Sequence, residues 1–344
     1  MGAASHAHEE SLIRKVVTAY TYVAVWIGLS GAVIMFNKYI LAYGGFPYPI
    51  TLTMWHMFFC ATLAIGLVKS GKVQSINMER ETYMRAIVPI GLCYAGTLWV
   101  GNAAYLYLSV SFIQMLKALM PVAVFSVGCC FGTDKFRWNT MTNMLLVTVG
   151  VAIASAGEIN FNIIGVMFQL SSIVTESIRL VLVQILLQSR GLKLNPITTL
   201  YYVAPCCFCF LLVPWLFLEA GKIAADPNVV ISPLILLANA MVAFGLNMAV
   251  FLLIGKTSAL TMNIAGVAKD WMLIGLSVWI YKSAVTQLNL FGYGIAFLAV
   301  CWYNFQKLQQ MKASAAQQQP VPVKDEEAVP LKAQNGSGSL SQRQ

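Results

Sequence analysis

The chain has few charged residues and almost no histidine. Asp, Glu, Lys and Arg make up 10% of its 344 residues, whereas hydrophobic residues make up 58%. In soluble globular domains about a quarter of the residues are charged, so this class is excluded and an integral membrane protein is predicted. His56 is the one histidine inside an apolar stretch. A membrane-embedded enzyme would need clustered His, Asp or Ser groups, so no catalytic residues and no enzyme are predicted.

Cysteine gives no sign of a disulfide framework or a metal site. All eight cysteines lie within apolar runs, where cysteine behaves as a small hydrophobic residue. Cys206 and Cys209 form a CxxC pair, but no second Cys or His pair accompanies it, so packing is the favoured interpretation. No metal and no cofactor is implied. The net charge of +9 comes from short basic clusters between apolar runs, which argues against nucleic acid as a partner.

Ten apolar stretches are long enough to cross a bilayer, which takes about 20 mostly apolar residues. They are residues 17–40, 50–68, 84–107, 109–131, 138–157, 162–188, 196–218, 231–254, 258–280 and 285–305. We therefore expect an all-α membrane protein with ten transmembrane helices embedded in a lipid bilayer. The third and fourth stretches are the hardest to separate, because no strong helix breaker stands at Leu108 and Ser109.

Basic residues are concentrated in alternate connections between these stretches. The even-numbered connections hold most of the Lys and Arg, whereas the odd-numbered ones hold little beyond Lys222 and Lys282. By the positive-inside rule the even connections face the cytosol, and with ten spans so do both termini. We expect a cytosolic segment over residues 1–16, without a plastid transit peptide. Residues 308–344 are rich in Gln, Pro, acidic and Gly/Ser residues and predict a disordered cytosolic tail.

The two halves of the chain share landmark residues at similar spacing, which indicates a duplication. The matched pairs are Lys38 and Arg179, Pro49–Thr51 and Pro196–Thr198, Asn102 and Asn247, and Lys117 and Lys269. Residues 17–157 and 158–307 would then be two five-helix repeats. An odd number of spans forces the second repeat to enter from the opposite side, and such inverted repeats commonly hold substrate between them. Chance similarity among apolar helices is the alternative.

Two lysines lie at bilayer depth in equivalent places of the two halves. A buried membrane charge is costly, so such residues normally face a polar cavity where they meet an ion or substrate. Polar and small residues share one helical face with each lysine: Ser111, Gln114, Lys117 and Pro121 in the fourth stretch, and Asn263, Gly266, Lys269 and Asp270 in the ninth. Lysine suits phosphate oxygens that are bound and released, so we predict a phosphorylated ligand. Alternatively, Lys117 pairs with Asp270 and only holds helices together.

Other polar residues in the spans are weaker candidates for substrate binding. Glu176 and Arg179 lie three residues apart and can neutralise one another, which leaves a substrate role for Arg179 open. Lys38 can extend to the membrane interface instead of binding substrate. Lys256 lies just before the ninth stretch, where exposed N–H groups favour anions. The remaining candidates for substrate binding are the duplicated pair Asn102 and Asn247.

Several segments resemble the triose-phosphate translocator and nucleotide-sugar transporter family of the drug/metabolite transporter superfamily. They are Asn37–Leu41, Tyr107–Pro121, Gly255–Asp270 and Leu290–Ala296. The resemblance covers approximately residues 17–307. It is greatest to a plant-type branch with Lys-Asp on the ninth span, which includes Golgi UDP-arabinofuranose transporters. The resemblance implies ten helices in two inverted repeats and assigns Lys117 and Lys269 to the substrate site.

The same resemblance implies antiport of a nucleotide sugar (UDP-pentose-like) against a nucleoside monophosphate across a Golgi membrane. The alternative is exchange of a sugar phosphate for phosphate, as in the plastid envelope. Phosphate translocators have a basic residue where this chain has Asp270. An acid there repels phosphate and could accept hydrogen bonds from sugar hydroxyls or uracil instead. The sequence leaves open which sugar is carried and whether the protein forms a homodimer.

Overall fold

The computed structural model describes residues 2–74, 78–190, 196–227, 232–253 and 259–317. These residues contain helices and connections and no strand, so the predicted all-α class is confirmed for the described part. The chain divides into two units, residues 1–304 and 305–344. The elements are α1 (Gly2–Ala42), α2 (Pro49–Lys69), α3 (Arg80–Thr82), the π-helical turn η1 (Tyr83–Ile87), α4 (Val88–Tyr107), α5 (Val110–Lys117), α6 (Met120–Phe131), α7 (Trp138–Ala156), α8 (Ile163–Arg190), α9 (Pro196–Leu218), α10 (Ala220–Ala225), α11 (Pro233–Leu253), α12 (Ala259–Tyr281) and α13 (Gln287–Gln317).

The helices follow the predicted spans closely. Nine segments of the described chain are long and apolar enough to cross a membrane. The predicted span over residues 258–280 coincides with α12, whose first side chains lie outside the described part. The total of ten spans therefore stays a prediction. Two ends differ: α1 begins at Gly2, so the predicted N-terminal segment continues the first helix, and α13 runs to Gln317, past the predicted start of the tail at residue 308.

A two-residue break separates α4 from α5. Leu108 and Ser109 adopt extended backbone conformations, and the Ser109 side chain accepts a hydrogen bond from the Phe112 N–H. A serine in this position is a preferred N-cap, because its oxygen satisfies a backbone donor that the first helical turn leaves free. The cap explains how a continuous apolar sequence becomes two helices without glycine or proline at the junction.

The fourth predicted span is itself discontinuous. It consists of α5, which ends at Lys117, and α6, which begins at Met120, with a turn at Ala118 and Leu119 between them. Pro121 occupies the first turn of α6, where its missing N–H costs no helical hydrogen bond. Lys117 therefore lies at the carboxyl end of a short helix, where the helix dipole favours a cation.

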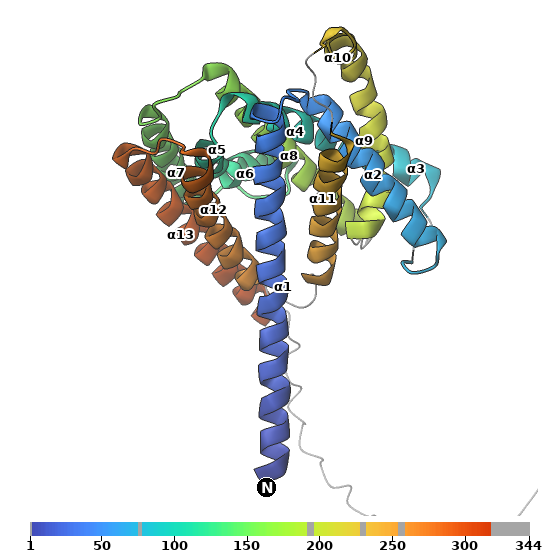
Figure 1. Cartoon of the computed structure of the whole chain (residues 1–344). Helices are drawn as coiled ribbons and strands as arrows, with labels where there is room; N and C mark the ends of the chain where they lie inside the picture. The colour runs from blue at the N-terminus through green and yellow to red at the C-terminus, as the bar shows by residue number, and fades with distance from the viewer. Residues whose placement is uncertain (1, 75–77, 191–195, 228–231, 254–258, 318–344) are drawn as a thin grey trace, which may run out of the picture. The chain divides into compact units, whose positions relative to one another are not determined.

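Several helix–helix contacts remain contacts when each helix of the first half is exchanged with the corresponding helix of the second half. Figure 1 shows α11 beside α1 and α9 beside α2. If α1, α2, α4, α5/α6 and α7 are matched in order with α8, α9, α11, α12 and α13, each of several packed pairs has its counterpart. The contacts α4–α8, α4–α9, α6–α8 and α2–α4 correspond to α11–α1, α11–α2, α12–α1 and α9–α11. The pairs α2–α9 and α5–α12 map onto themselves.

The helices α7 and α13 approach each other through glycine. A Cβ atom placed on Gly150 would lie 2.5 Å from the Ala296 nitrogen, and one on Gly292 would lie 2.3 Å from the Ala154 nitrogen. Only glycine fits such backbone contact, which is how many membrane helices associate. The Asn289 side chain also donates to the Ala154 carbonyl at 2.6 Å. This contact between α7 and α13 is therefore close and hydrogen-bonded.

Candidate functional site

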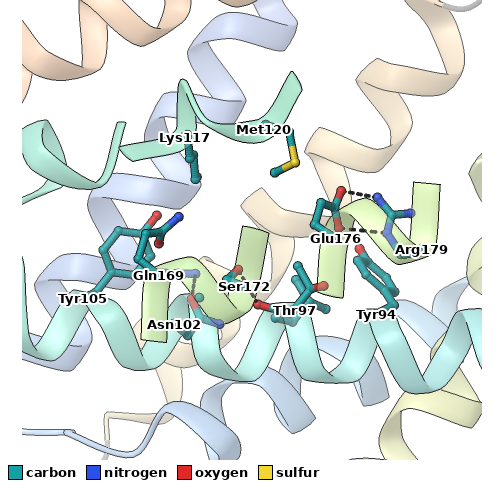
Figure 2. A pocket seen from close by; sticks show the side chains of 13 residues that line it. Tyr94, Thr97, Asn102, Tyr105, Lys117, Met120, Gln169, Ser172, Glu176 and Arg179 are labelled. Atoms are coloured by element: carbon teal, nitrogen blue, oxygen red, sulfur yellow. Dashed lines mark hydrogen bonds and ion pairs between the residues drawn. The ribbon is translucent and has the colours of Figure 1, made fainter. Parts of the chain in front are cut away.

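A cavity of about 420 Å³ opens between α1, α4, α8 and the break between α5 and α6. Figure 2 shows Lys117 and Met120 pointing from the broken helix toward side chains of α4 and α8. Amide, hydroxyl and charged groups reach into it, although most of its wall surface is apolar. The lining residues are Asn37, Tyr94, Thr97, Leu98, Gly101, Asn102, Tyr105, Lys117, Met120, Gln169, Ser172, Glu176 and Arg179.

Lys117 is the cavity cation that has no carboxylate within 4.0 Å among the described residues. Its side chain is half-buried, and its ammonium group is attracted at longer range by Asp270 and Glu176. A partly dehydrated ammonium with spare N–H donors is well suited to bind an anion that enters the cavity. The alternative predicted role, a direct ion pair that only holds helices together, has no contact to support it in this conformation.

Arg179 also lines the cavity but is already paired. Its Nε donates to Glu176 Oε2 at 2.9 Å, and a second N–H donates to Glu176 Oε1. The guanidinium also lies 4.9 Å from the centre of the Tyr94 ring. A two-point Arg–Glu pair stacked on an aromatic ring is satisfied without ligand. An entering phosphate would have to compete with Glu176 for this arginine.

Lys269 lies beside Asp270 and outside the cavity lining. The Lys269 Nζ is 3.7 Å from Asp270 Oδ1 and 5.6 Å from the centre of the Trp26 ring on α1. The Lys117 and Lys269 ammonium groups repel each other, and both are attracted to Asp270. The charges of the two predicted lysines thus interact, and the adjacent Asp270 carboxylate balances the charge of Lys269.

A buried chain of amide hydrogen bonds reaches the cavity at two of its members, Asn37 and Asn102. Asn37 Nδ2 donates to Asn102 Oδ1 at 3.1 Å, and Asn102 Nδ2 donates to Thr53 Oγ1 at 2.9 Å. On its other side Asn37 accepts from Asn239 Nδ2 at 3.0 Å, and Asn239 Oδ1 bonds to His56 Nε2. Each of these five side chains is at most 7% exposed. His56 of α2 is thereby joined to α11.

Lys38 caps the carboxyl end of α4 and does not line the cavity. Its Nζ donates to the carbonyl oxygens of Tyr105 at 2.6 Å and Leu108 at 2.9 Å. These carbonyls are among the last of α4 and have no further helical N–H to accept from. A lysine here satisfies them and matches the negative end of the helix dipole. The alternative in which Lys38 extends to the membrane interface does not match this structure, because the side chain turns inward and is 7% exposed.

The other predicted residues lie away from the cavity lining or outside the described part. Ser111 is buried, and its N–H donates to Ser277 Oγ on α12 at 3.3 Å. Gln114 is 1% exposed, and its amide O and N have no hydrogen-bond partner among the described residues. Asn247 donates to the Ala243 carbonyl of its own helix. The side chain of Asn263 and the whole of Lys256 lie outside the described residues.

Several cavity residues were missed by sequence reasoning although a signal for them exists. Gln169, Ser172, Glu176 and Arg179 recur at three- or four-residue spacing on α8 and so share one face. Sequence reasoning used only the last two of them. Asn37 was left ambiguous by sequence reasoning, as a neighbour of Lys38 in a matching motif. Asn239 carries no local signal, because its hydrogen-bond partners are 183 and 202 residues away in sequence.

Comparison with known proteins relates the chain to a family of membrane transporters. The model of the Triose-phosphate Transporter family matches residues 17–304. A probable sugar phosphate/phosphate translocator of Arabidopsis thaliana is 54% identical over 325 residues, which cover 94% of this chain and 93% of the relative. Two others from the same plant, with the same descriptive name, are 53% identical. They cover 98% and 95% of this chain and 97% and 95% of their own lengths.

Proposed function

Because the chain belongs to the Triose-phosphate Transporter family, we propose that it is a secondary antiporter that exchanges a nucleotide sugar for a nucleoside monophosphate. The observation that carries the proposal is Lys117, a cation without a close carboxylate among the described residues. It faces a cavity whose walls are otherwise rich in amide and hydroxyl groups. The lysine would hold phosphate oxygens, and the neutral polar wall would accept sugar hydroxyls or base edges.

The charge balance around the cavity favours a ligand that has a large uncharged part. Arg179 is paired with Glu176, and Lys269 is offset by Asp270, so Lys117 alone is left without a close counter-charge among the described groups. A small phosphate dianion would be held by little beyond one ammonium group. A nucleotide sugar adds hydroxyl and base contacts, and about 420 Å³ lies in the range of roughly 300–1,000 Å³ that encloses drug-sized ligands.

A second candidate, exchange of sugar phosphate for inorganic phosphate, is favoured by the names of the relatives. The three similar Arabidopsis thaliana proteins are each named a probable sugar phosphate/phosphate translocator. Both candidates share Lys117 as the phosphate-binding group. They differ in the role of Asp270, which would weaken binding of a small free phosphate and leave binding of a sugar or base intact.

Alternating access through two inverted repeats would perform the exchange. The exchangeable packing pairs across the halves support repeats over residues 17–157 and 158–307, since a two-fold relation requires each contact to have its counterpart. Lys117 lies where a span is interrupted, and interrupted helices commonly supply substrate ligands near the bilayer midplane. The basic even-numbered connections support cytosolic termini, and we place the protein in the Golgi membrane.

Uptake into liposomes tests the proposal. Purified protein is reconstituted in vesicles that are preloaded with UMP or with inorganic phosphate, and labelled UDP-arabinose or dihydroxyacetone phosphate is offered outside. We expect UDP-arabinose uptake that depends on internal UMP. Uptake of dihydroxyacetone phosphate against phosphate alone would replace the first candidate by the second. Failure with every phosphorylated compound of a wider panel would contradict both.

A further inference from the structure

The amide chain beside the cavity has a fixed direction. The Thr53 hydroxyl donates to the Pro49 carbonyl at 2.7 Å, so the Thr53 oxygen is free to accept from the Asn102 N–H. Asn102 must then present its oxygen to Asn37. Every following group is set by the one before it, because a flipped amide would bring two oxygens or two N–H groups together.

The far end of the chain assigns a role to the histidine. Asn37 accepts from Asn239, which leaves the Asn239 oxygen directed at His56 Nε2. His56 must carry its hydrogen on this nitrogen to donate. The amide chain therefore starts at the His56 donor on α2 and passes through side chains of α11, α1 and α4. It ends at a backbone carbonyl of α2. His56 and Thr53 are its two anchors.

We propose that His56, Asn239 and Thr53 are positioning residues that hold the Asn37 and Asn102 amides as a pair of substrate ligands. Each of these two amides donates one N–H within the chain and retains a second N–H without a partner among the described residues. Both residues line the cavity, where Lys117 supplies the charge. The inference rests on the proposed function and adds that this amide pair binds hydroxyl or carbonyl oxygens of the uncharged part of the substrate.

Helix packing alone does not account for the amide chain. Five buried polar side chains lose their hydration, and apolar residues of similar volume would join the same helices without that cost. A network whose hydrogen bonds all run in one direction does fix one arrangement of its members, as a binding site requires. Polar groups that must be matched also reject a ligand that lacks the matching oxygen more strongly than an apolar wall would.

The test uses one disabling and one conserving variant at each anchor. His56→Leu removes the donor, whereas His56→Gln keeps an N–H that can reach Asn239. Thr53→Val removes the hydroxyl, whereas Thr53→Ser keeps it. Met57→Leu, at a buried apolar position next to His56, controls for changes in packing. Uptake of UDP-arabinose and of dihydroxyacetone phosphate gives KM and kcat, and competition by inorganic phosphate gives the affinity for a ligand with no uncharged part.

We expect His56→Leu and Thr53→Val to raise the KM of the transported compound about 3- to 10-fold, as for one weakened hydrogen bond. The inhibition constant of phosphate should stay within about twofold of wild type, because that ligand does not reach the amide pair. The two conserving variants and Met57→Leu should keep wild-type KM. Equal losses for both ligands, or no change in either, would overturn the proposal.

A double-mutant cycle measured by thermal unfolding tests the amide chain even if no transported compound is found. His56 and Asn102 share no hydrogen bond but belong to the same amide chain, so His56→Leu and Asn102→Leu should together lower Tm by less than the sum of their separate effects. His56→Leu with Thr97→Val, which lies on the cavity but outside the chain, should be additive. Additive Tm changes for His56→Leu and Asn102→Leu would reject the amide chain. Failure of uptake alone would reject only the proposed function.

Discussion

Lys117 and Lys38 have different surroundings and therefore different expected roles. Lys117 faces the cavity without a close carboxylate among the described groups, whereas Lys38 donates to two carbonyls at the end of α4. Position in an apolar span does not distinguish them, because both are lysines at membrane depth. The contacts of each ammonium group do.

Replacing Lys117 by Met should abolish most exchange without unfolding the protein. A charge-assisted hydrogen bond to substrate contributes about 1.5–3 kcal/mol, so kcat/KM should fall by roughly 10- to 150-fold. Lys117→Arg should retain part of the activity, since it keeps the charge in a larger planar group. Vesicle uptake with equal amounts of reconstituted protein measures both. Wild-type kcat/KM in Lys117→Met would remove the lysine from the site.

Replacing Lys38 by Met should instead lower stability and leave substrate affinity unchanged. The substitution leaves the Tyr105 and Leu108 carbonyls without the ammonium donor, which costs about 1–3 kcal/mol. Thermal unfolding in detergent should therefore show a lower Tm than wild type. The KM of the protein that remains folded should match wild type, and a raised KM with unchanged Tm would place Lys38 in the substrate site after all.

Replacing Asp270 by Asn should shift preference toward small phosphate ligands. The acid lies 3.7 Å from Lys269 and attracts Lys117, so its removal leaves both ammonium groups more available to phosphate oxygens. We expect the affinity for inorganic phosphate to rise about 3- to 10-fold relative to that for UDP-arabinose. Competition assays measure the ratio. An unchanged ratio would mean that Asp270 does not select between the two proposed substrates.

At the residue scale, sequence predicted the charged groups better than the neutral ones. Lys117 and Arg179 are conspicuous in an apolar span because a charge there is costly. Gln169 and Ser172 are less conspicuous, although their spacing from Glu176 would have indicated one face of α8. The partnership of His56 with Asn239 could not be predicted from one sequence, because it joins residues whose proximity depends on the packing of α2 against α11.

At the scale of elements, sequence predicted where helices run but not where they are interrupted. The boundary after α4 depends on one side chain, Ser109, whose capping oxygen competes with continuation of the helix. The break after Lys117 is signalled by Pro121, which lacks the N–H that would bond the Lys117 carbonyl and whose ring would clash with that carbonyl in a continuous helix. Hydropathy averages over windows longer than these breaks and so cannot resolve them.

Substitution of Gly292 by Ala should weaken the contact between α13 and α7. The added methyl group would lie 2.3 Å from the Ala154 nitrogen, and such overpacking typically costs about 1–3 kcal/mol. Gly294→Ala is the matched control on the same helix, since a Cβ there meets nothing within 4 Å. Tm should fall for the first variant and stay level or rise slightly for the second. Equal Tm values would show that the backbones separate easily.

At the scale of the whole molecule, the positive-inside asymmetry predicts which connections face the cytosol. A glycosylation acceptor inserted beside Lys222, between α9 and α11, should be modified in cells if this connection faces the lumen as predicted. The same insertion beside Lys135, between α6 and α7, should stay unmodified. A mobility shift that is sensitive to glycosidase reports the result. Modification at Lys135 and not at Lys222 would reverse the proposed orientation.

The all-helical class and the approximate spans were predictable because hydropathy is a strong signal in membrane proteins: nearly all backbone polar groups must bond within helices. The repeat relation is a weaker signal, since it depends on a few matched residues such as Asn102 and Asn247. These two residues differ in their contacts, because one joins the amide chain and the other bonds within its own helix. Such a difference would make a duplication hard to recognise from side chains alone.

The glycine contact between α7 and α13 also offers an internal length standard for studying the transport cycle. Neither helix contributes a lining residue to the cavity, and their backbones touch at Gly150 and Gly292. Paired spectroscopic probes on the outer faces of these two helices should keep one separation whether or not ligand is bound. Probes on α1 and α8, which line the cavity, can then be calibrated against them, so that changes in distance are assigned to the cavity walls.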